Sequence, residues 1–460
     1  MRPVSTSISK PRPAAGAGDL VPIGVIDHRG PRRGAAFGIA PDDMLRGVYI
    51  LGKTGTGKTT LLEGMVVAQM EAGQGCAIVD PHGDLAERVL ALVPRWRTND
   101  VVLIDGSDVG HVVGLNLLEC PAPSQRHLVA STVISIFRKL YGEFWGPRMQ
   151  HCFLNTLLAV LAAPNPTLLS VPRMLSEPSF RAKVLAHVTD DGVRHFWEHE
   201  FARMPAGFAA EVVAPVQNKV GAALASPLLR AMFAQSRSAF SFRGVMDAGQ
   251  ILIARLPKGL MGEDASAFLG AVLVGGFQMA AYSRADTPEG NRRPFALYVD
   301  EFPSMVTDSF AGLLSEGRKY GLALVLAHQH VDQLEQQLQS AVLGNAGTIV
   351  AFRMGARDAE RLGPEFTPEF APGDLTRLGR HQVALRLSIQ GVTSVPFSAV
   401  TLPPRSGCRA RADIVRAVAR ERYSIPVVTT QNAPPERSLH REVIHRPAAP
   451  VPPYAQHLPL

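Results

Sequence analysis

Residues 48–65, VYILGKTGTGKTTLLEGM, contain the segment that decides the fold. Within this segment, Gly52 to Thr59 match the pattern GxxxxGK[ST] at every fixed position. The apolar stretch VYIL precedes the glycines, and the helical stretch TLLEGMVVAQM follows them. This order predicts a phosphate-binding loop, in which backbone N–H groups and a helix N-terminus face phosphate oxygens.

Two side chains of this loop are expected to have separate tasks. Lys58 is predicted to reach the β- and γ-phosphates of ATP, and Thr59 to offer its hydroxyl to Mg²⁺. The predicted nucleotide-binding residues are Gly52, Lys53, Thr54, Gly55, Thr56, Gly57, Lys58, Thr59 and Thr60.

Short apolar runs recur on both sides of the loop. Besides GVYILG they are GCAIVD, VVLID, ILIARL, FALYVDE, LALVLAHQ, TIVAF and QVALRL. Most are apolar on both faces, which is typical of strands covered by helices on both sides. Helical stretches follow several of them, so the sequence predicts an α/β fold with a mostly parallel sheet.

One interval, from about Pro121 to Phe242, lacks this pattern. It contains helical segments such as RHLVASTVISIFRKLYG and RMQHCFLNTLLAVLAA and no convincing strand, so we interpret it as an inserted all-α domain. The predicted organisation is a disordered tail (1–18), an α/β ATPase domain (19–120 and 243–404), the all-α insertion (121–242), a basic helix and strap (405–432) and a Pro-rich disordered tail (433–460).

A phosphate-binding loop needs an acidic partner at the end of another strand. Asp80, Asp105 and Asp300 each end an apolar run, but only Asp300 is followed by a glutamate. We therefore assign Asp300 to the metal and Glu301 to the base that accepts a proton from the attacking water. The turn DPHGD, with Asp80, His82 and Asp84, allows either a part in the site or turn chemistry and helix capping.

Two further side chains are predicted to act on the transferred phosphoryl group. Gln329 ends the run LVLAHQ at the edge of the sheet where ligands bind, so its amide is expected to sense the γ-phosphate or orient water. Arg318 lies upstream in SEGRKYG and is the candidate for an extra cation supplied by a neighbouring subunit, although a solvated helix face is the alternative.

Two other patterns argue for different functions. HFWEH, His195 to His199, has the spacing of one class of zinc protease, but it needs a third ligand from elsewhere and also fits a polar helix face. QNKVG, Gln217 to Gly221, lacks the aspartate of a guanine-recognition loop and lies in a region that is expected to be helical. A GTP-specific switch is therefore not predicted.

The composition describes a globular protein whose basic residues gather at its ends. Hydrophobic residues make up 46% and charged residues 19% of the 460 residues. Residues 1–46 carry seven Lys/Arg against four Asp/Glu, and residues 405–460 carry nine against four. The excess of basic residues therefore lies at the two ends of the chain, and the formal charge of +7 is weak evidence for nucleic-acid binding. Within Arg405 to Tyr423, an expected amphipathic helix places Arg409, Arg416 and Arg420 near one face, for contact with DNA or for packing.

Cysteine usage and hydropathy suggest a cytoplasmic protein. The four cysteines form no CxxC pair, which is typical of free thiols in a reducing compartment. The uncharged run Ala265 to Ser283 is nearly long enough to span a bilayer, but its glycines and Gln278 favour a buried helix. No integral membrane segment is therefore predicted.

The ordered set of motifs resembles a known family. GKTGTGKTT, DPHGD, WGPR, PVQNKVG, LPKG, LYVDEF, SEGRKYGLALVLAHQ and LGNAGTIVAFRMGARDAERL occur in this order. Together they resemble the conjugative coupling-protein ATPases of type IV secretion (TraG/TraD-like), within the HerA/FtsK superfamily of DNA-pumping ATPases. The resemblance covers roughly residues 20 to 430.

The resemblance implies a RecA-like motor domain with an inserted all-α domain, in a homo-hexameric ring with ATP between subunits. It maps the loop lysine and hydroxyl onto Lys58 and Thr59, the acidic pair onto Asp300 and Glu301, the glutamine onto Gln329 and the trans-acting arginine onto Arg318, with Lys319 as its neighbour. Membrane-anchored members begin with transmembrane helices, which are not predicted here, so a partner is expected to recruit this protein to the inner face of the membrane.

The leading hypothesis is an ATP-dependent translocase of single- or double-stranded DNA that works with secretion-channel or relaxosome proteins. Two alternatives keep the nucleotide site. One is an ATP-driven motor that exports protein, and the other is a nucleotide-gated adaptor that docks a cargo protein and turns over little ATP.

Overall fold

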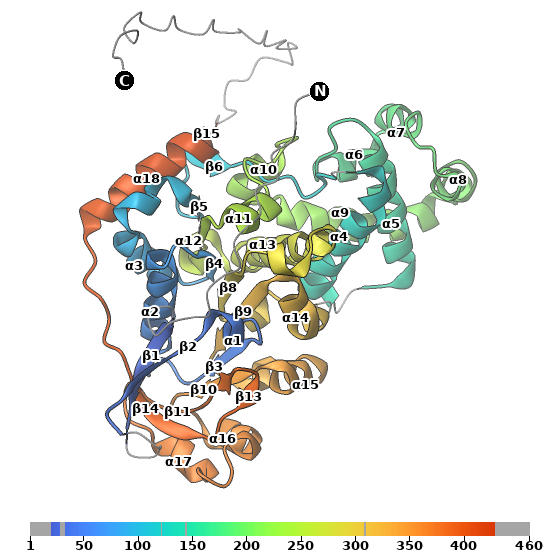
Figure 1. Ribbon diagram of the computed structural model, residues 1–460. Helices are drawn as coiled ribbons and strands as arrows, with labels where there is room; N and C mark the ends of the chain where they lie inside the picture. Colours follow the sequence, from blue (N-terminus) through green and yellow to red (C-terminus); the bar gives the residue numbers. More distant parts are fainter. Residues whose placement is uncertain (1–19, 28–32, 121, 143–144, 308–309, 428–460) are drawn as a thin grey trace, which may run out of the picture. The chain divides into compact units, whose positions relative to one another are not determined.

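The centre of the molecule is an eleven-stranded sheet, seen in a computed structural model that describes residues 20–27, 33–120, 122–142, 145–307 and 310–427 (Figure 1). In spatial order, the strands are β2 (Ala36–Ile39), β1 (Val21–Ile26), β14 (Phe397–Thr401), β11 (Gln382–Arg386), β10 (Thr348–Ala351), β3 (Val48–Leu51), β9 (Leu322–His328), β8 (Phe295–Asp300), β4 (Gly75–Asp80), β7 (Ile251–Arg255) and β5 (Val101–Asp105).

Seven adjacent strands of this sheet, from β10 to β5, are parallel, which confirms the predicted α/β fold. The other four are antiparallel, including β11, which was predicted as a strand without its direction. Sequence patterns did not identify β1, β2 or β14. Pro22 and Gly24 interrupt the apolar pattern of β1 and coincide with a shift in its register against β2.

Helices cover both faces of the sheet, because alternate side chains of each buried strand point to opposite sides. In β4, Cys76 and Ile78 belong to the apolar core on one face, while Ala77 and Val79 belong to the core on the other. The first face is covered by α2 (Lys58–Glu71), α3 (Asp84–Leu92) and α18 (Arg409–Tyr423). The second is covered by α11 (Phe242–Ala248), α13 (Glu263–Ser283), α14 (Phe310–Glu316) and α15 (Gln336–Asn345).

Helix α13 is the helix that hydropathy singled out. Among the described residues, the stretch Glu263–Asp286 is long and apolar enough to cross a membrane by length and composition alone. In this fold 72% of its apolar window is buried, with Phe268 and Phe277 fully inside the core. The prediction of a buried core helix is confirmed.

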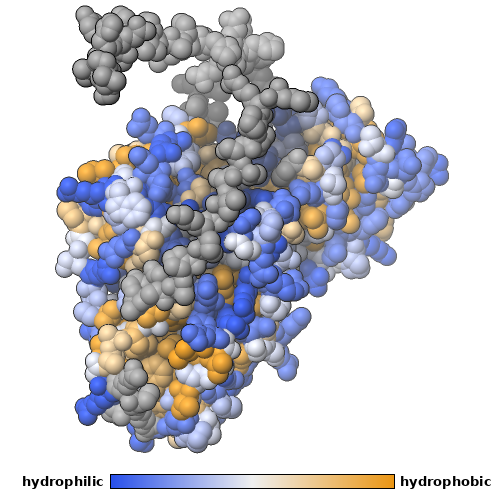
Figure 2. All heavy atoms as spheres, viewed as in Figure 1, coloured by the Kyte–Doolittle hydropathy of each residue, from blue (hydrophilic) through white to orange (hydrophobic). Residues whose placement is uncertain are grey.

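A helical segment separates β6 from β7. It contains α4 (Arg126–Tyr141), α5 (Pro147–Ala162), α6 (Ser170–Ser176), α7 (Pro178–Leu185), α8 (Asp191–His195), α9 (Ala206–Ala223) and α10 (Pro227–Phe233). Its apolar side chains, including Phe137, Phe153 and Trp197, join the core on the second face of the sheet. Hydrophilic residues cover most of the face of this segment that Figure 2 shows.

Short elements complete the fold. They are α1 (Pro41–Met44), α12 (Lys258–Met261), α16 (Ala356–Leu362), α17 (Pro372–Arg377), the pair β6 (His111–Val113) and β15 (Ser424–Pro426), and the pair β12 (Ser388–Ile389) and β13 (Val392–Thr393). The β6–β15 pair fastens the end of α18 beside β5.

Candidate active site

The predicted phosphate-binding loop connects β3 to α2, and the ends of two other strands, β10 and β11, hold its backbone. The N–H of Lys53 donates to the carbonyl of Arg353, which follows β10, at 3.0 Å. The N–H of His381, just before β11, donates to the carbonyl of Thr56 at 2.9 Å. Within the loop, the Thr56 hydroxyl donates to the carbonyl of Lys53 at 2.7 Å. These bonds hold the backbone of the loop against the rest of the sheet.

Two loop glycines have backbone angles that other residues rarely adopt. Gly55 has φ 77° and Gly57 has φ 123°. A Cβ atom at Gly57 would lie 2.7 Å from Nδ1 of His381, so this position also lacks space for a side chain. The result is an open cradle of backbone N–H groups at the start of α2, which fits a phosphate group.

Lys58 is buried at this cradle, as the motif predicts. Its Nζ donates to the carbonyl of Gly52 at 2.5 Å and lies 3.4 Å from that of Lys53. Burial lowers the pKa of Lys58, and the nearby carboxyl groups of Asp300 and Glu301 oppose that shift. The ammonium group is thus placed between the loop and the acidic pair, where a bound phosphate would meet it.

The acidic pair lies at the end of β8, which is two strands away from β3, and its members have different surroundings. Asp300 is 6% exposed, and its Oδ1 accepts the N–H of Glu301 at 3.1 Å. Burial, with the nearby Asp80 and Glu301 charges, raises the pKa of Asp300 to about 7, although Lys58 acts in the opposite direction. Such a carboxyl group gains from a neighbouring cation, so its chemistry suits a Mg²⁺ ligand.

This raised pKa predicts that Mg²⁺ binding depends on pH. Because the metal competes with a proton on Asp300, Mg²⁺ affinity should rise through pH 7 and be about tenfold weaker at pH 6 than at pH 8. In the protein without metal, the folding stability changes with pH in the opposite direction to the Mg²⁺ affinity. The folded pKa exceeds the unfolded value of 3.8, so the stability from this group is greatest below that value and is lost as the pH rises through 7.

Calorimetric titration of Mg²⁺ into the protein with a non-hydrolysable ATP analogue, at pH 6, 7 and 8, would measure the effect. Asp300→Asn should remove the pH dependence together with tight metal binding. A pH dependence that survives in Asp300→Asn would contradict the assignment.

Glu301 has a left-handed backbone, with φ 48° and ψ 43°. Such a conformation is strained for a residue other than glycine and often marks a functional site. Its Oε1 accepts the side-chain N–H of Gln329 at 2.7 Å, and the amide oxygen of Gln329 accepts the hydroxyl of Thr54 at 2.7 Å. The structure thus brings together the predicted base, the predicted sensing amide and the loop, although residues 54 and 329 lie 275 positions apart.

Asp80 and Asp105, the other aspartates that end strands, have structural partners. Asp80 is fully buried, and its two oxygens accept the backbone N–H groups of His82 and Ala86, each at 2.9 Å. Its carboxylate therefore shapes the turn and caps the start of α3. Asp105 accepts two bonds from Ser107 and one from Arg255, and these contacts outweigh burial and lower its pKa. The side chains of His82 and Asp84 are exposed.

His328 is a buried residue of the site that sequence reasoning did not single out. Its Nε2 lies 2.7 Å from the hydroxyl of Tyr49 on β3, and its Nδ1 lies 3.2 Å from the amide oxygen of Gln333. Burial lowers the pKa of His328 to about 3, so the ring is neutral at physiological pH. The ring fixes the strand end that carries Gln329. The sequence could have identified His328 as a residue of the site, because it lies directly before Gln329.

Arg318 and Lys319 lie far from this loop, in the turn η9 (Gly317–Tyr320) that precedes β9. Both side chains are exposed. Because β9 has seven residues and ends beside Gln329, the turn is roughly 23 Å from the loop along the strand. Arg318 therefore does not join the site of its own chain.

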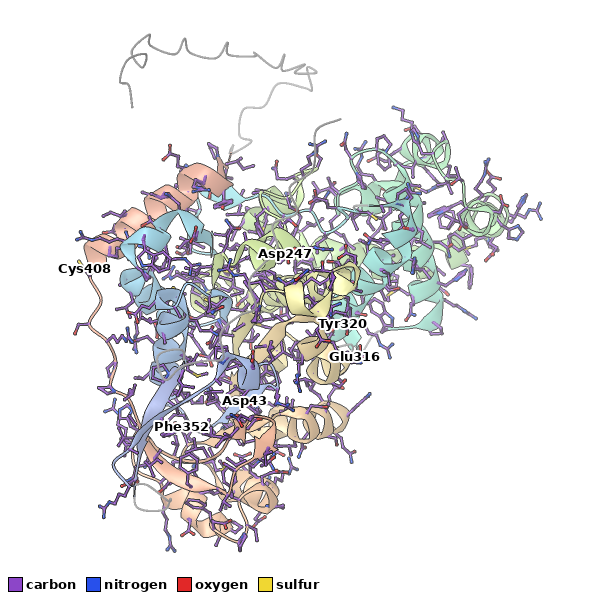
Figure 3. All side chains as sticks on the ribbon, viewed as in Figure 1. Asp43, Asp247, Glu316, Tyr320, Phe352 and Cys408 are labelled. Carbon is purple, nitrogen blue, oxygen red and sulfur yellow. The ribbon has the colours of Figure 1, made fainter. Side chains whose placement is uncertain are left out.

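Two arginines donate hydrogen bonds to the backbone of the turn that carries Arg318. Arg284 is 1% exposed and donates to the carbonyl of Tyr320 at 3.1 Å, while Arg292 donates to the carbonyl of Lys319. Arg284 is also bonded to Asp247 at 2.9 Å. Figure 3 labels Asp247, Glu316, which precedes the turn, and Tyr320, the last residue of the turn. These contacts hold the backbone of the turn that carries the two exposed cations.

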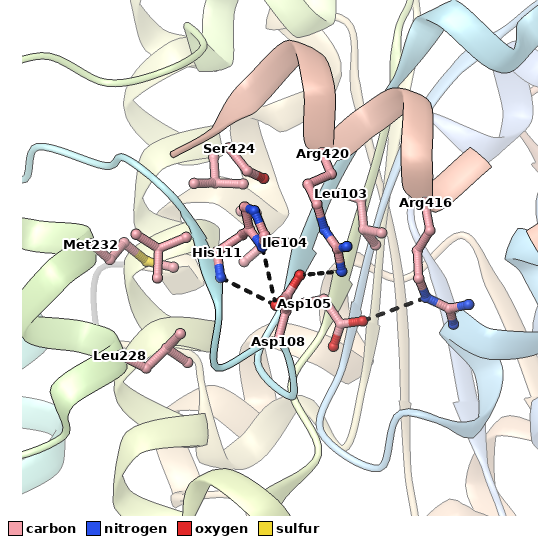
Figure 4. A pocket seen from close by; sticks show the side chains of 12 residues that line it. Leu103, Ile104, Asp105, Asp108, His111, Leu228, Met232, Arg416, Arg420 and Ser424 are labelled. Atoms are coloured by element: carbon pink, nitrogen blue, oxygen red, sulfur yellow. Dashed lines mark hydrogen bonds and ion pairs between the residues drawn. The ribbon is translucent and has the colours of Figure 1, made fainter. Parts of the chain in front are cut away.

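The basic helix α18 packs against its own chain. Arg416 contacts Glu87. Arg420 donates to Asp108 at 2.6 Å, and Arg416 lies 3.7 Å from Asp105 (Figure 4). These ion pairs line a small pocket between α18, β5, β6 and α10. Both arginines are thus paired with carboxylates of their own chain, which favours packing over DNA contact. Arg409, at the start of the helix, is exposed.

The two patterns that suggested other functions have structural explanations. His195 and His199 lie with their rings 5.0 Å apart, while Glu198 pairs with Arg194 at 3.2 Å. Within the described part of the chain, no group of three His, Cys, Asp or Glu residues has a geometry that would hold a metal. QNKVG lies inside α9, as the sequence predicted.

A protein-family model matches this chain. The model of the "Type IV secretion-system coupling protein DNA-binding domain" family matches residues 35–362, which include the loop, the acidic pair, Arg318 and Gln329. A comparison with curated proteins gave no match.

Solved structures with a similar fold include two of the bacterial conjugative coupling protein TrwB. The unbound monoclinic form of TrwBdeltaN70 has a TM-score of 0.60 and 15% identity, over 81% of this chain and 88% of that one. TrwB in complex with ADP and Mg²⁺ has a TM-score of 0.59 and 16% identity, over 80% and 88%. VirB4 of Thermoanaerobacter pseudethanolicus has a TM-score of 0.57 and 15% identity, over 86% and 99%. These likenesses concern the fold.

Proposed function

The chain belongs to the type IV secretion-system coupling-protein family, and from this premise we propose that it is an ATP-dependent DNA translocase. The observation that carries the proposal is the meeting of Lys58, Asp300, Glu301 and Gln329 around one phosphate-binding loop. A loop alone would serve any nucleotide-binding protein. A base and an amide at its side are the parts that hydrolysis needs.

In this proposal, ATP and Mg²⁺ bind at the loop, from Gly52 to Thr60. Lys58 binds the β- and γ-phosphates, and the Thr59 hydroxyl and Asp300 hold the metal. Bound Mg²⁺ would supply positive charge against the phosphates. Glu301 accepts a proton from the attacking water, and Gln329 sits beside it to sense the γ-phosphate.

The chain works as a homo-hexamer in which each nucleotide lies between two subunits. Residues 19–120 and 243–404 form the RecA-like motor domain, and residues 121–242 form the inserted all-α domain. The proposed partners are DNA, which a motor holds mainly through phosphates, and secretion-channel or relaxosome proteins. Such a protein acts in the cytoplasm and is brought to the inner face of the membrane by a partner.

The test is ATP hydrolysis by the purified chain with no polymer, with single-stranded DNA and with double-stranded DNA, at low and moderate salt. We expect strong stimulation by DNA that weakens with salt, because phosphate contacts release counterions. Turnover that is indifferent to DNA would favour a protein-export motor. Absence of turnover under every condition would favour a nucleotide-gated adaptor.

Arg318 is proposed to act on the nucleotide of the neighbouring subunit, which its distance from its own loop supports. Arg318→Ala and Lys58→Ala should each abolish turnover alone. An equal mixture should regain activity, because roughly a quarter of its interfaces would pair an intact loop with an intact arginine. The measurement is turnover of mixed rings against the two separate variants.

The neighbouring Lys319→Ala is the matched control for this experiment. It should keep full turnover if Arg318 is the trans-acting cation. Failure of the mixture to recover, with both variants folded and assembled, would contradict action between subunits.

A further inference from the structure

We propose that Thr54 is a positioning residue that orients the amide of Gln329 and, through it, the carboxylate of Glu301. The inference rests on the proposed function, because it assigns Glu301 the role of base. It adds a task for a loop side chain whose expected role was only to line the phosphate site. Two hydrogen bonds in series carry it, each 2.7 Å long.

The direction of the amide follows from its two neighbours. The Thr54 hydroxyl donates to Oε1 of Gln329, and Nε2 of Gln329 donates to Oε1 of Glu301. The reversed amide would place its oxygen against a carboxylate oxygen, and both are acceptors. A donor at Thr54 and an acceptor at Glu301 therefore select one orientation.

The held orientation determines which part of Glu301 is available. Its Oε1 is occupied by Gln329, while Oε2 has no hydrogen bond to another described residue. Oε2 is therefore the oxygen that can accept a proton from water. Because Glu301 is only half-buried, its side chain would otherwise be free to rotate.

The two hydrogen bonds from Thr54 through Gln329 to Glu301 form a relay, and its first member is held in the loop. Thr54 is exposed and lies between two fixed points, the bond from Lys53 N–H to Arg353 and the bond from His381 N–H to Thr56. Gln329 directly follows His328, whose ring is bonded to Tyr49. The backbone is thus held on both sides of the Thr54–Gln329 contact. The position of Thr54 therefore determines the position of the Gln329 amide.

The first test is a double-mutant cycle on steady-state ATP hydrolysis by the full chain. Thr54→Val keeps the shape and removes the donor, so kcat should fall about tenfold while the KM for ATP stays within about twofold. Thr54→Ser restores the donor and should restore kcat. In a Gln329→Ala background, Thr54→Val should cause no further loss. Thr393→Val, on an exposed strand far along the chain, is the control.

Three results would overturn the relay. They are an equal loss in both backgrounds, a serine variant as slow as the valine variant, and an effect on KM alone. The last would mean that Thr54 only contacts the nucleotide.

A second readout needs no nucleotide. In protein labelled with ¹⁵N-glutamine, the side-chain NH₂ signals of Gln329 are those lost in Gln329→Ala. Thr54→Val should shift them, and Thr393→Val should not. Unshifted signals would overturn the contact itself.

The two proposals fail in different ways. If Thr54 and Gln329 are coupled in basal turnover but DNA does not stimulate turnover, the relay is supported and the DNA-translocase proposal is rejected. If DNA stimulates turnover but Thr54 and Gln329 are not coupled, the DNA-translocase proposal is supported and the relay is rejected.

Discussion

Glu301→Gln is expected to bind ATP and hydrolyse it about 10²- to 10⁴-fold more slowly than the unchanged protein, the usual contribution of a general base. Glutamine keeps the shape of the side chain and an oxygen that accepts the N–H of Gln329, now at 2.7 Å from Glu301. It cannot take a proton from water at neutral pH. The loss should therefore fall on kcat.

Nucleotide binding should survive this change for an electrostatic reason. The charge of Glu301 is one of the causes that raise the pKa of Asp300. Without that charge, Asp300 ionises more readily at pH 7 and should hold Mg²⁺ at least as well. Calorimetry with ATP and Mg²⁺, beside steady-state turnover, would separate binding from hydrolysis.

The matched control is Glu211→Gln, which changes an exposed glutamate on α9. It should leave turnover unchanged. If Glu301→Gln kept full turnover, another group would be the base, and the role given to Glu301 would be wrong.

Lys58→Ala is expected to reduce turnover by about 10³-fold or more, because it removes a buried cation aimed at the transferring phosphoryl group. The variant also loses the donor that bonds the carbonyl of Gly52 at 2.5 Å. Lys58 lowers the pKa of Asp300, so without it that carboxyl group should bind a proton more tightly and Mg²⁺ more weakly. Both kcat and nucleotide affinity should therefore fall.

The measurement is turnover at saturating Mg²⁺, together with binding of a non-hydrolysable ATP analogue and the thermal midpoint of unfolding. Lys183→Ala, an exposed lysine on α7, serves as the control. Unchanged turnover in a folded Lys58→Ala variant would show that this loop is not the hydrolytic site.

The sequence by itself determined the α/β fold, the loop and the acidic pair at the end of β8. Each depends on residues close together in the chain, such as the glycines between an apolar strand and a helix, or a glutamate directly after Asp300. Local backbone preference and burial are enough to produce such features. The assignment of roles to Lys58, Thr59, Asp300, Glu301 and Gln329 stays a prediction from these patterns, and the fold is consistent with it.

Only the tertiary structure decided which of the remaining charged and polar groups face one another. Asp80 and Asp300 both end a buried strand, yet two backbone N–H groups occupy Asp80 while Asp300 stays short of partners. The sequence left Arg416 open to contact with DNA or to packing, and the fold places Glu87, 329 positions away, beside it. Thr54 meets Gln329 because β9 lies next to β3. Strand order sets these contacts, and neither hydropathy nor local spacing encodes strand order.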